Sequence, residues 1–571
     1  MASSVAPGVC GKRLLPTTID QLSREDPDRP WASIPRDDYD LSQGFVDISY
    51  AVLANAVNKL AWLVERSIGR SDSFETIAYL GTPDIRYHMM QMAVCKTGHK
   101  VLYSSQLNSL AVHLSLMKQT DCKHIFSAVG VNVSDIIGSR PMGAYDVPEL
   151  EELLDMEDKV PHFPYTKTFE EAFHEPSTQD AQELLPDVGG RKHLQALHKP
   201  GKGVRFIMVT LPFHALSAGF AMIMTVFGGG VFVPGFAHRA TQPEEICDIL
   251  DHAHVTQSLF TPWMMDYIAR QPNAQAYIEP FDSAMYCGAF LAEEAACVWA
   301  RWTTVRPAWG ATETLAPPQL VGDDNGEDYS YVLFDPAHSG IEFRDVGTTY
   351  AAAEAGAEPT PLYEMVFTIS PATAPVASWH ANQGVDIAAV AAAGEGPGAE
   401  GGYPELRIGD LWAPHPDPAK AGVAWRFVGR VDDIISFSSG VNYHPGPMEK
   451  LIRGHEAVSE ALVLGTGHRQ PVALAEAVKN EVWVSCIEPG NSIVPSHGKI
   501  SEWHMIILPA GSFVRTLKGN VIRRQTERKF WEAIGKIYAE FGDEWQDGRD
   551  RYGSISKSVS LEVSVEVQDK A

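Results

Sequence analysis

The segment Gln257–Cys287, which reads QSLFTPWMMDYIARQPNAQAYIEPFDSAMYC, decides the fold class of this chain. It predicts strands over Gln257–Thr261 and Ser283–Cys287 and a helix over Pro262–Arg270, because short apolar runs flank a stretch with helical spacing. The alternation extends on both sides, with strands expected over Arg205–Leu211, Val231–Val233 and Val305–Trp309 and helices over Ala218–Phe227, Glu244–His252 and Leu291–Trp302. Strands separated by helices of this length predict a mostly parallel sheet with helices on both faces. Ligands bind such sheets beyond the carboxyl ends of the strands, so the turns there are the candidate site.

The rest of the chain predicts the domain organisation. Upstream, Tyr50–Arg66 has the spacing of an amphipathic helix, and further helices are expected over Asp84–Val94 and Leu107–Met117 around a strand at Val101–Tyr103. After Gly429 the pattern is that of a smaller α+β unit. The sequence therefore predicts an α/β fold made of a large N-terminal domain of mostly parallel sheets flanked by helices (1–430), a small C-terminal α+β lid domain (431–541) and a tail (542–571).

Composition narrows the functional classes. The chain has 571 residues with 46 Lys and Arg against 72 Asp and Glu, so its formal net charge is −26. Nucleic acids and anionic membranes are bound by clustered Lys and Arg, so this balance argues against both as partners. Seven cysteines are scattered without a C-x-x-C pair, which is typical of neither a disulfide framework nor a zinc site and suits a reducing compartment.

The uncharged stretch Leu211–Ala237 is the one candidate for a membrane span. Gly228–Gly230 interrupts it, and Val231–Val233 has the character of a strand, so a buried helix followed by a buried strand is the favoured interpretation. Met1–Arg13 lacks an apolar signal-peptide core, and the C-terminus is not a peroxisomal tripeptide. We therefore expect a cytoplasmic protein.

Three segments carry chemistry, and the first, Trp309–Thr314 (WGATET), directly follows a predicted strand. Its aromatic ring offers a stacking face, its glycine allows close approach of the backbone, its threonines can bind phosphate oxygens, and Glu313 can ligate Mg²⁺. The alternative is a tight turn with a solvated glutamate, and six residues alone favour that alternative.

The second segment runs from Gly409–Trp412 (GDLW) to Gly429–Ile435 (GRVDDII) and on to Glu449. An aspartate such as Asp410 can accept hydrogen bonds from both hydroxyls of a ribose, and a nearby arginine can complete the cradle. The pair Asp432-Asp433 stands where the pattern changes and is a natural hinge. The alternative is a β-hairpin with an Asp-rich loop, which is the better interpretation of either piece alone.

The third segment is Arg515–Arg524 (RTLKGNVIRR). Lys518 beside a glycine, between basic residues, could place an ammonium on a phosphate and a carboxylate. The alternative is an ordinary turn before a helix expected over Gln525–Tyr538, with the basic residues on a solvated face.

In this order and spacing the three segments resemble the adenylate-forming superfamily, which contains acyl-CoA synthetases, luciferases and the adenylation domains of nonribosomal peptide synthetases (NRPS). The resemblance covers roughly Pro16 to Phe541 and is strongest to fungal NRPS-like adenylating enzymes and to the adenylation domains of carboxylate reductases. The marks of that subgroup are Pro30–Pro35 (PWASIP), Tyr79–Tyr87 (YLGTPDIRY), Ser104–Ser109 (SSQLNS) and Leu211–Ala215 (LPFHA).

The resemblance assigns roles to individual residues. Trp309 would stack on adenine, with Gly288 and Ala289 on its other side, and Asp410 and Arg430 would hold the ribose. Three further residues would act on the phosphates: Thr312 on the α-phosphate, Glu313 as the Mg²⁺ ligand, and Lys518 as the bridge between the substrate carboxylate and the α-phosphate.

Two more residues receive roles by the same resemblance. Asp432 would be the hinge about which the small domain rotates between adenylation and thioester formation. His214 resembles the pocket-side histidine of the aryl- and acyl-activating branches, while a buried histidine bonded to backbone is an equally weighted alternative. Arg523 is a further candidate for a local cation at the site.

One expected element is missing from the sequence. Members of the family bear a loop of the form S-G-S-T-G-x-P-K that cradles the β- and γ-phosphates, and it should lie between Tyr165–Ala172 and Leu211–His214. No such run is present there, and Gly201–Gly203 is too short to wrap a triphosphate. A wrongly joined coding sequence is one explanation, and a degenerate member that lost triphosphate binding is the other. In either case we expect this chain to adenylate poorly or not at all.

The resemblance also implies the reaction. The expected function is ATP-dependent activation of an organic acid, aryl, keto or fatty, with ATP/AMP and Mg²⁺ as cofactors and CoA or phosphopantetheine as thiol acceptor. His214 stands where amino-acid-activating relatives usually place an aspartate for the α-amine, so an acid without an α-amine is favoured. No carrier-domain serine motif or reductase signature follows Phe541, so a separate carrier protein is a possible partner. The alternative is a non-catalytic member that only binds a ligand or partner.

Overall fold

The computed structural model describes residues 14–542, apart from 107, 166–202, 215, 289–290, 312–313, 315, 318, 322–327, 336–338, 351–359, 369–404, 439–441, 478–481, 493, 495 and 516–520. The chain divides into two compact units, which are described separately. The first unit comprises Met1–Ile341 and Thr368–Pro404, and the second comprises Glu342–Phe367 and Glu405–Ala571. The predicted boundary at residue 430 lies inside the second unit, and the predicted lid and tail stay predictions.

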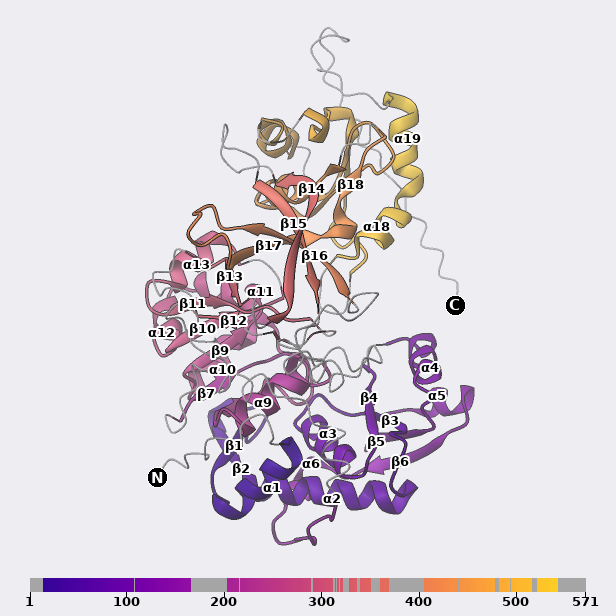
Figure 1. Ribbon diagram of the computed structural model, residues 1–571, viewed down its shortest axis with the longest axis vertical. Coiled ribbons are helices and arrows are strands. Elements are labelled where there is room, and N and C mark those ends of the chain that lie inside the picture. Colours follow the sequence, from indigo (N-terminus) through magenta and orange to yellow (C-terminus); the bar gives the residue numbers. More distant parts are fainter. Residues whose placement is uncertain are drawn as a thin grey trace, which may run out of the picture. The chain divides into compact units, whose positions relative to one another are not determined.

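A seven-stranded sheet forms the centre of the first unit, in the order β11-β10-β9-β7-β8-β1-β2 (Figure 1). All neighbours pair in parallel except β1 and β2, which are antiparallel. Its strands are β1 Pro30–Pro35, β2 Phe45–Ser49, β7 Arg205–Ile207, β8 Val231–Val233, β9 Gln257–Phe260, β10 Ser283–Tyr286 and β11 Thr304–Pro307. The predicted mostly parallel sheet is therefore confirmed.

Helices accompany these strands, and their positions follow the predicted alternation closely. They are α10 Pro243–His252, α11 Pro262–Ala269, α12 Ala274–Ile278 and α13 Glu293–Trp299. A hairpin of β12 Gln319–Leu320 and β13 Val332–Phe334 follows. The core around these helices is built from apolar side chains such as Ile246, Met265 and Trp299, all of them fully buried.

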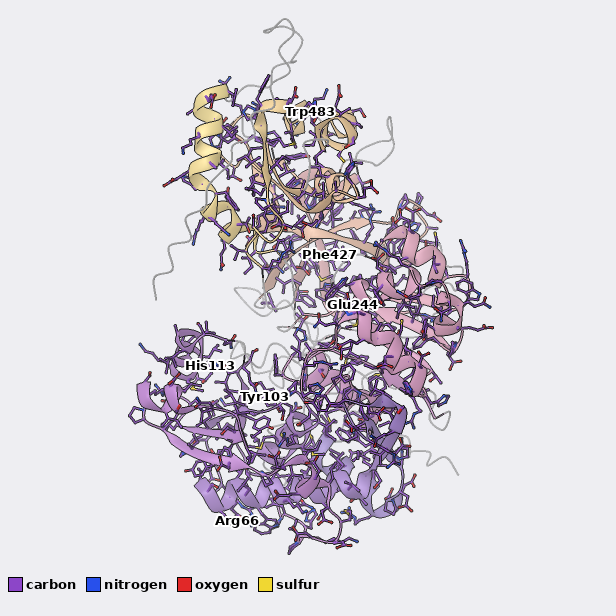
Figure 2. All side chains as sticks on the ribbon, turned by 180° about the vertical axis from the view of Figure 1, so that it is seen from behind. Arg66, Tyr103, His113, Glu244, Phe427 and Trp483 are labelled. Carbon is purple, nitrogen blue, oxygen red and sulfur yellow. The ribbon has the colours of Figure 1, made fainter. Side chains whose placement is uncertain are left out.

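A second, four-stranded parallel sheet precedes the large sheet in sequence, in the order β4-β3-β5-β6. Its strands are β3 Thr76–Leu80, β4 Lys100–Tyr103, β5 His124–Ala128 and β6 Gly143–Val147, and its helices are α3 Arg86–Lys96, α4 Leu110–Gln119, α5 Ser134–Ser139 and α6 Leu150–Leu154. Tyr103, labelled in Figure 2, closes a cluster of edge-to-face rings with Tyr79 and Tyr87.

The helix α2, Tyr50–Ile68, matches the predicted amphipathic helix. Ser49 caps its first turn by accepting a hydrogen bond from the Val52 amide, and Gly69 ends it with φ +83°, a conformation that side chains disfavour. The predicted apolar stripe is buried against α1, Leu15–Glu25, and the neighbouring strands. The segment 14–49 was missed as structure because Pro30 and Pro35 break the strand pattern, although prolines are accepted at strand ends, where they stand in β1.

The uncharged stretch Leu211–Ala237 folds as predicted into a buried helix and a buried strand. A π-helical turn, η3 Leu216–Phe220, runs into α9 Ala221–Val226, and β8 follows. Across the described part of the chain, no helix combines the length and apolar character needed to cross a bilayer.

The second unit begins with four strands in the order β17-β16-β15-β14, of which β15, β16 and β17 pair antiparallel. Their bounds are β14 Ile341–Tyr350, β15 Thr360–Phe367, β16 Leu406–Pro414 and β17 Ala424–Arg430, and a 3-10 turn, Val431–Asp433, follows β17. A hairpin of β18 Ile435–Ser436 and β19 Asn442–Tyr443 comes next.

The remainder is the α+β arrangement expected from the sequence. A three-stranded sheet in the order β20-β21-β22 is accompanied by helices at α16, α18 and α19. The bounds are α16 Gly446–Arg453, β20 Val458–Leu464, β21 Val472–Ala477, β22 Met505–Leu508, α18 Arg523–Lys529 and α19 Trp531–Phe541, with short turns at Trp483–Ile487, Glu488–Gly490, Ser496–Gly498 and Glu502–His504. The single helix predicted over Gln525–Tyr538 is wrong, because buried Phe530 leaves helical geometry (φ −106°, ψ 12°) between α18 and α19.

Candidate functional site

The carboxyl ends of three neighbouring parallel strands define the first part of the candidate site. Phe260 of β9, Tyr286 of β10 and Pro307 of β11 stand side by side in the register. Gly288 and Trp309 each follow these partners by two residues, at the same edge of the sheet. The Ala308 amide donates to the Tyr286 carbonyl (2.8 Å), which fixes this alignment past the last strand residue.

Trp309 is half-buried, and its backbone is held by the side chain of Gln319. Its amide donates to Gln319 Oε1 (2.9 Å), and Gln319 Nε2 donates back to the Trp309 carbonyl (2.7 Å). The indole meets Phe334 edge to face, with 6.0 Å between ring centroids. Gln319, which sequence reasoning missed, is buried and sets the course of the chain at Trp309.

Gly288 is not crowded by neighbouring atoms. Its φ is +91°, and a Cβ built on it meets no atom within 4 Å. A side chain at this position would be strained by its backbone rather than by crowding. Ala289, Thr312 and Glu313, the other residues assigned to this edge, lie outside the described residues.

His214 lies in the turn that precedes η3, and it is half-buried. Its Nδ1 accepts a hydrogen bond from the Leu216 amide (3.2 Å), and its carbonyl accepts from the Ala218 amide (2.9 Å). Since Nδ1 is an acceptor, the neutral ring carries its proton on Nε2. The alternative of a histidine bonded to backbone therefore holds for Nδ1, and the pocket-side role of His214 stays a prediction.

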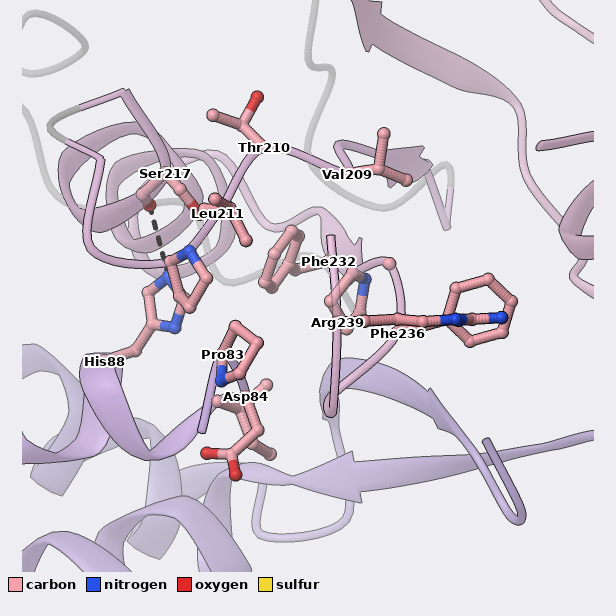
Figure 3. A pocket seen from close by; sticks show the side chains of 14 residues that line it. Pro83, Asp84, His88, Val209, Thr210, Leu211, Ser217, Phe232, Phe236 and Arg239 are labelled. Carbon is pink, nitrogen blue, oxygen red and sulfur yellow. Dashed lines mark hydrogen bonds between the residues drawn. The ribbon is translucent and has the colours of Figure 1, made fainter. Parts of the chain in front are cut away.

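A small pocket, partly open to solvent, lies at the carboxyl ends of β7, β8 and β3 (Figure 3). Apolar side chains form most of its wall, with Arg239 and Asp84 among its charged residues. His88 Nε2 lies 3.2 Å from the Ser217 carbonyl, the contact dashed in Figure 3. Burial lowers the pKa of His88 to about 4, so this imidazole is neutral near pH 7.

A buried ion pair supports the floor of this pocket. Arg86 Nη2 lies 2.8 Å from Asp84 Oδ2, both side chains are 5% exposed, and the Arg86 amide also donates to Asp84 (2.8 Å). Burial raises the pKa of the Asp84 carboxyl, although the hydrogen bonds from Arg86 favour its charged form. This pair lies within the segment YLGTPDIRY, where the chain passes from β3 into α3.

Asp410 and Arg430, the two residues assigned to the ribose, meet in the second unit. They are register partners on β16 and β17, and Arg430 Nη1 donates to Asp410 Oδ1 (2.6 Å). Asp410 is 9% exposed and Arg430 is 50% exposed. Gly409 has φ +77° beside this pair, and a Cβ there would stand 3.5 Å from Arg430 Nη2. The β-hairpin alternative is therefore present with the Asp–Arg pair within it, and the ribose role of the pair stays a prediction.

The predicted hinge residue Asp432 lies in the 3-10 turn Val431–Asp433, just after Arg430. Its carboxylate lies 3.4 Å from Arg524, and both side chains are mostly exposed, a pairing that contributes little stability in water. Its neighbour Asp433 is paired more deeply, with Arg523 Nε at 3.1 Å. Burial raises the pKa of Asp433, against the opposing effects of Arg523 and of a hydrogen bond from the Arg430 backbone.

Arg523 is not a free cation of the site, as the sequence suggested, because its guanidinium is committed to protein groups. Besides Asp433, it donates to the Val463 carbonyl (2.7 Å) and forms an ion pair with Glu449. Lys518 lies outside the described residues, while Arg515 and Val521 on either side of its segment are joined by an antiparallel bridge. Within the described residues, no group of three or more His, Cys, Asp or Glu side chains is arranged to hold a metal ion.

The predicted residues thus fall in both units. Trp309, Gly288 and His214 belong to the first unit, and Asp410, Arg430 and Asp432 to the second. The structure places Gly288 and Trp309 after neighbouring strands of one sheet, and it brings Asp410 into contact with Arg430. A mostly parallel α/β unit, followed by a unit with an Asp–Arg pair and an α+β part, is the order of units expected from the resemblance to the adenylate-forming superfamily.

Comparisons with known proteins agree with this class. Residues 432–542 match the family described as AMP-binding enzyme C-terminal domain. A carboxylic acid reductase of Neurospora crassa is 25% identical over 601 aligned residues, covering 97% of this chain and 53% of the reductase. An isocyanide synthase-NRPS hybrid of Aspergillus fumigatus is 24% identical over 578 aligned residues, covering 94% of this chain and 34% of the hybrid. This chain therefore spans between about a third and about half of these relatives.

Solved structures share the fold at low sequence identity. The O-succinylbenzoate coenzyme A synthetase of Bacillus subtilis, solved in complex with AMP, has a TM-score of 0.60 and 14% identity, covering 89% of this chain and 97% of the synthetase. ATP-bound MatB of Rhodopseudomonas palustris has a TM-score of 0.62 and 14% identity, covering 91% of this chain and 99% of MatB. The resemblance to the adenylate-forming superfamily, with fungal NRPS-like relatives, is thereby confirmed.

Proposed function

We propose that this chain binds ATP and activates a small organic acid lacking an α-amine as an acyl adenylate, which then passes to a thiol. In the first step an oxygen of the acid attacks the α-phosphorus, and the bond to pyrophosphate breaks. In the second step a thiol sulfur attacks the acyl carbon, and AMP leaves. The thiol in this proposal is that of CoA or of a phosphopantetheine group.

The observation that carries the proposal is the Asp410–Arg430 pair. Arg430 Nη1 holds one carboxylate oxygen of Asp410 on the hairpin β16–β17, so the ion pair orients the carboxylate without help from a ligand. A ribose presents two adjacent hydroxyls, and an oriented carboxylate can accept hydrogen bonds from both. In this proposal Trp309 stacks on the adenine, in the open space that Gly288 leaves.

The remaining roles rest on residues outside the described part of the chain. Glu313 would hold Mg²⁺, an oxygen-seeking cation that neutralises phosphate charge when bound. Thr312 would contact the α-phosphate, and Lys518 would stabilise the charge that develops between carboxylate and phosphate. Most of the interval in which the triphosphate loop was not found, between Ala172 and Leu211, also lies outside the described residues, which omit 166–202.

The test separates nucleotide binding from catalysis. AMP binding is measured by calorimetry, and acid-dependent exchange of labelled pyrophosphate into ATP is measured with aryl, keto and fatty acids, and with amino acids as the contrasting class. We expect AMP binding, and weak exchange that depends on an acid without an α-amine. Binding without any exchange supports the catalytically impaired alternative. Failure to bind AMP or ATP would overturn the proposal.

Asp410→Ala supplies the matched variant. It removes a carboxylate that accepts charge-assisted hydrogen bonds, each worth about 1.5–3 kcal/mol, so AMP affinity should fall by roughly 10- to 150-fold. Asp417→Ala is the control, because Asp417 lies in the exposed loop of the same hairpin, where its side chain accepts a hydrogen bond from the nearby Ala419 amide (2.9 Å). Equal affinity of both variants for AMP would contradict the role of Asp410.

A further inference from the structure

Arg523 is the centre of a buried charged cluster that the proposed reaction does not use. Its side chain is 15% exposed, and its guanidinium reaches three separate elements of the second unit. It donates to Asp433 at the end of the 3-10 turn (3.1 Å) and to the Val463 carbonyl of β20 (2.7 Å), and it pairs with Glu449 of α16. One side chain on α18 therefore joins a turn, a strand and a helix.

The partners of Arg523 are themselves well fixed. Glu449 is 7% exposed, and its Oε1 also accepts from the Val463 amide (2.7 Å), so strand and helix are tied through the same carboxylate. Truncating one partner of such a pair leaves a buried charge without compensation, which is strongly destabilising. Arg524, the next residue, makes only an exposed contact with Asp432. The cluster thus distinguishes Asp433 from Asp432 as the firmly held residue of the turn.

The position of Asp433 gives the cluster a consequence for the ribose pair. Only Val431 and Asp432 separate Asp433 from Arg430, which ends β17 and meets Asp410. The turn itself is closed by the Ile434 amide, which donates to the Val431 carbonyl (3.1 Å). Anchoring Asp433 at the far end of this turn therefore restricts the backbone on which Arg430 is carried.

We propose that Arg523 is a positioning residue that, through Asp433, holds the turn Val431–Asp433 and so keeps Arg430 in the conformation in which it meets Asp410. The inference rests on the proposed function only for its ligand, because the anchoring itself is a property of the free protein. It also predicts that the turn Val431–Asp433 keeps a fixed position relative to α16, β20 and α18. A bend of the chain near this turn would therefore occur at Arg430 and not after it.

The test uses the full chain and compares Arg523→Met, Arg523→Lys and Asp433→Asn. Arg528→Met is the matched control, because Arg528 is an exposed arginine of the same helix α18. The first readout is hydrogen exchange of the turn, residues 431–434, relative to the amides of strand β20. The second readout is the dissociation constant for AMP.

We expect Arg523→Met and Asp433→Asn to speed exchange of the turn at least tenfold relative to Arg528→Met, with a smaller change in β20. AMP affinity should fall at least fivefold, and Arg523→Lys should recover part of both effects because an ammonium can reach one partner. If Arg523→Met does not fold, Asp433→Asn decides the question, since it leaves the Arg523–Glu449 pair intact.

Two results would overturn the inference. One is exchange of the turn in Asp433→Asn within twofold of the control. The other is faster exchange of the turn with unchanged AMP affinity, which would make the cluster structural only. If wild-type chain fails to bind AMP, the proposed function fails, while exchange of the turn still decides whether Arg523 anchors it.

Discussion

At the scale of single residues, burial distinguishes the charged groups that are paired inside the fold from those that remain accessible to solvent. Lys96 is fully buried, and its ammonium donates to Asp20 (2.8 Å) and Asn58 (2.9 Å). Burial lowers the pKa of Lys96, and Asp20 opposes that effect. Arg430, in contrast, keeps half of its side chain exposed while pairing with Asp410. The sequence alone does not distinguish the two, because Lys96 and Arg430 are both basic residues with neighbours of mixed character.

His88 gives a prediction about pH at this scale. Burial lowers its pKa from 6.5 to about 4. As the pH falls, His88 therefore binds a proton near pH 6.5 in the unfolded chain but only near pH 4 in the native chain. Stability is therefore lost as the pH falls through that window. Between pH 7.5 and 5, wild type should lose about 2 kcal/mol more of its unfolding free energy than His88→Gln, measured by urea unfolding of the first unit.

His254→Gln is the control for this prediction, because the His254 side chain is exposed. Its unfolding free energy should keep the full dependence on pH. A His88→Gln variant with the same pH dependence as wild type would mean that His88 does not stay neutral in the fold.

At the scale of elements, glycine acts in opposite ways at two positions. Gly69 ends α2 with φ +83°, whereas Gly535 lies within α19 without a positive φ. Neither glycine has an atom within 4 Å of a built Cβ, so packing does not separate the two cases. The backbone conformation alone therefore decides whether an alanine substitution raises or lowers the unfolding free energy.

Gly69→Ala should therefore lower the unfolding free energy by about 1–2 kcal/mol, because alanine is strained where φ is positive. Gly535→Ala should raise it by about 0.5–1 kcal/mol, because alanine is the better helix former. Chemical denaturation of the two variants against wild type measures both changes. Changes of the same sign would contradict the assignment of these backbone conformations.

Elements also mark the limit of prediction from sequence. The helix α2 was found because its apolar stripe repeats over five turns within one local segment. The break between α18 and α19 was missed because Phe530, Ile534 and Ile537 have the spacing of one continuous helix, although the backbone of Phe530 is not helical. Strand β7 ends at Ile207, shorter than predicted, since only Arg205–Ile207 find parallel partners on β8.

At the scale of the whole molecule, each unit has a hydrophobic core of its own. Leu60 is fully buried in the core of the first unit, and Leu474 is fully buried in that of the second. Units with separate cores generally unfold in separate transitions, so a single unfolding free energy does not describe such a chain.

Calorimetry of a matched pair of variants tests this separation. Leu60→Ala and Leu474→Ala each remove a buried leucine side chain, at a cost of about 2–5 kcal/mol. Each should lower the transition of its own unit and leave the other in place. If both variants lower one common transition, the two units unfold cooperatively.

The local pattern of the sequence determined the alternation of strands and helices, the mostly parallel sheet and the order of the three chemical segments. Tertiary structure alone decided which of these residues meet. The pairing of β10 with β11 places the segments that carry Gly288 and Trp309 at one edge of the sheet, and the pairing of β16 with β17 joins Asp410 to Arg430. The contact of Arg523 with Asp433 spans 90 residues. Such contacts depend on strand register and on burial, which are set by packing between distant segments and leave no periodic trace within either one.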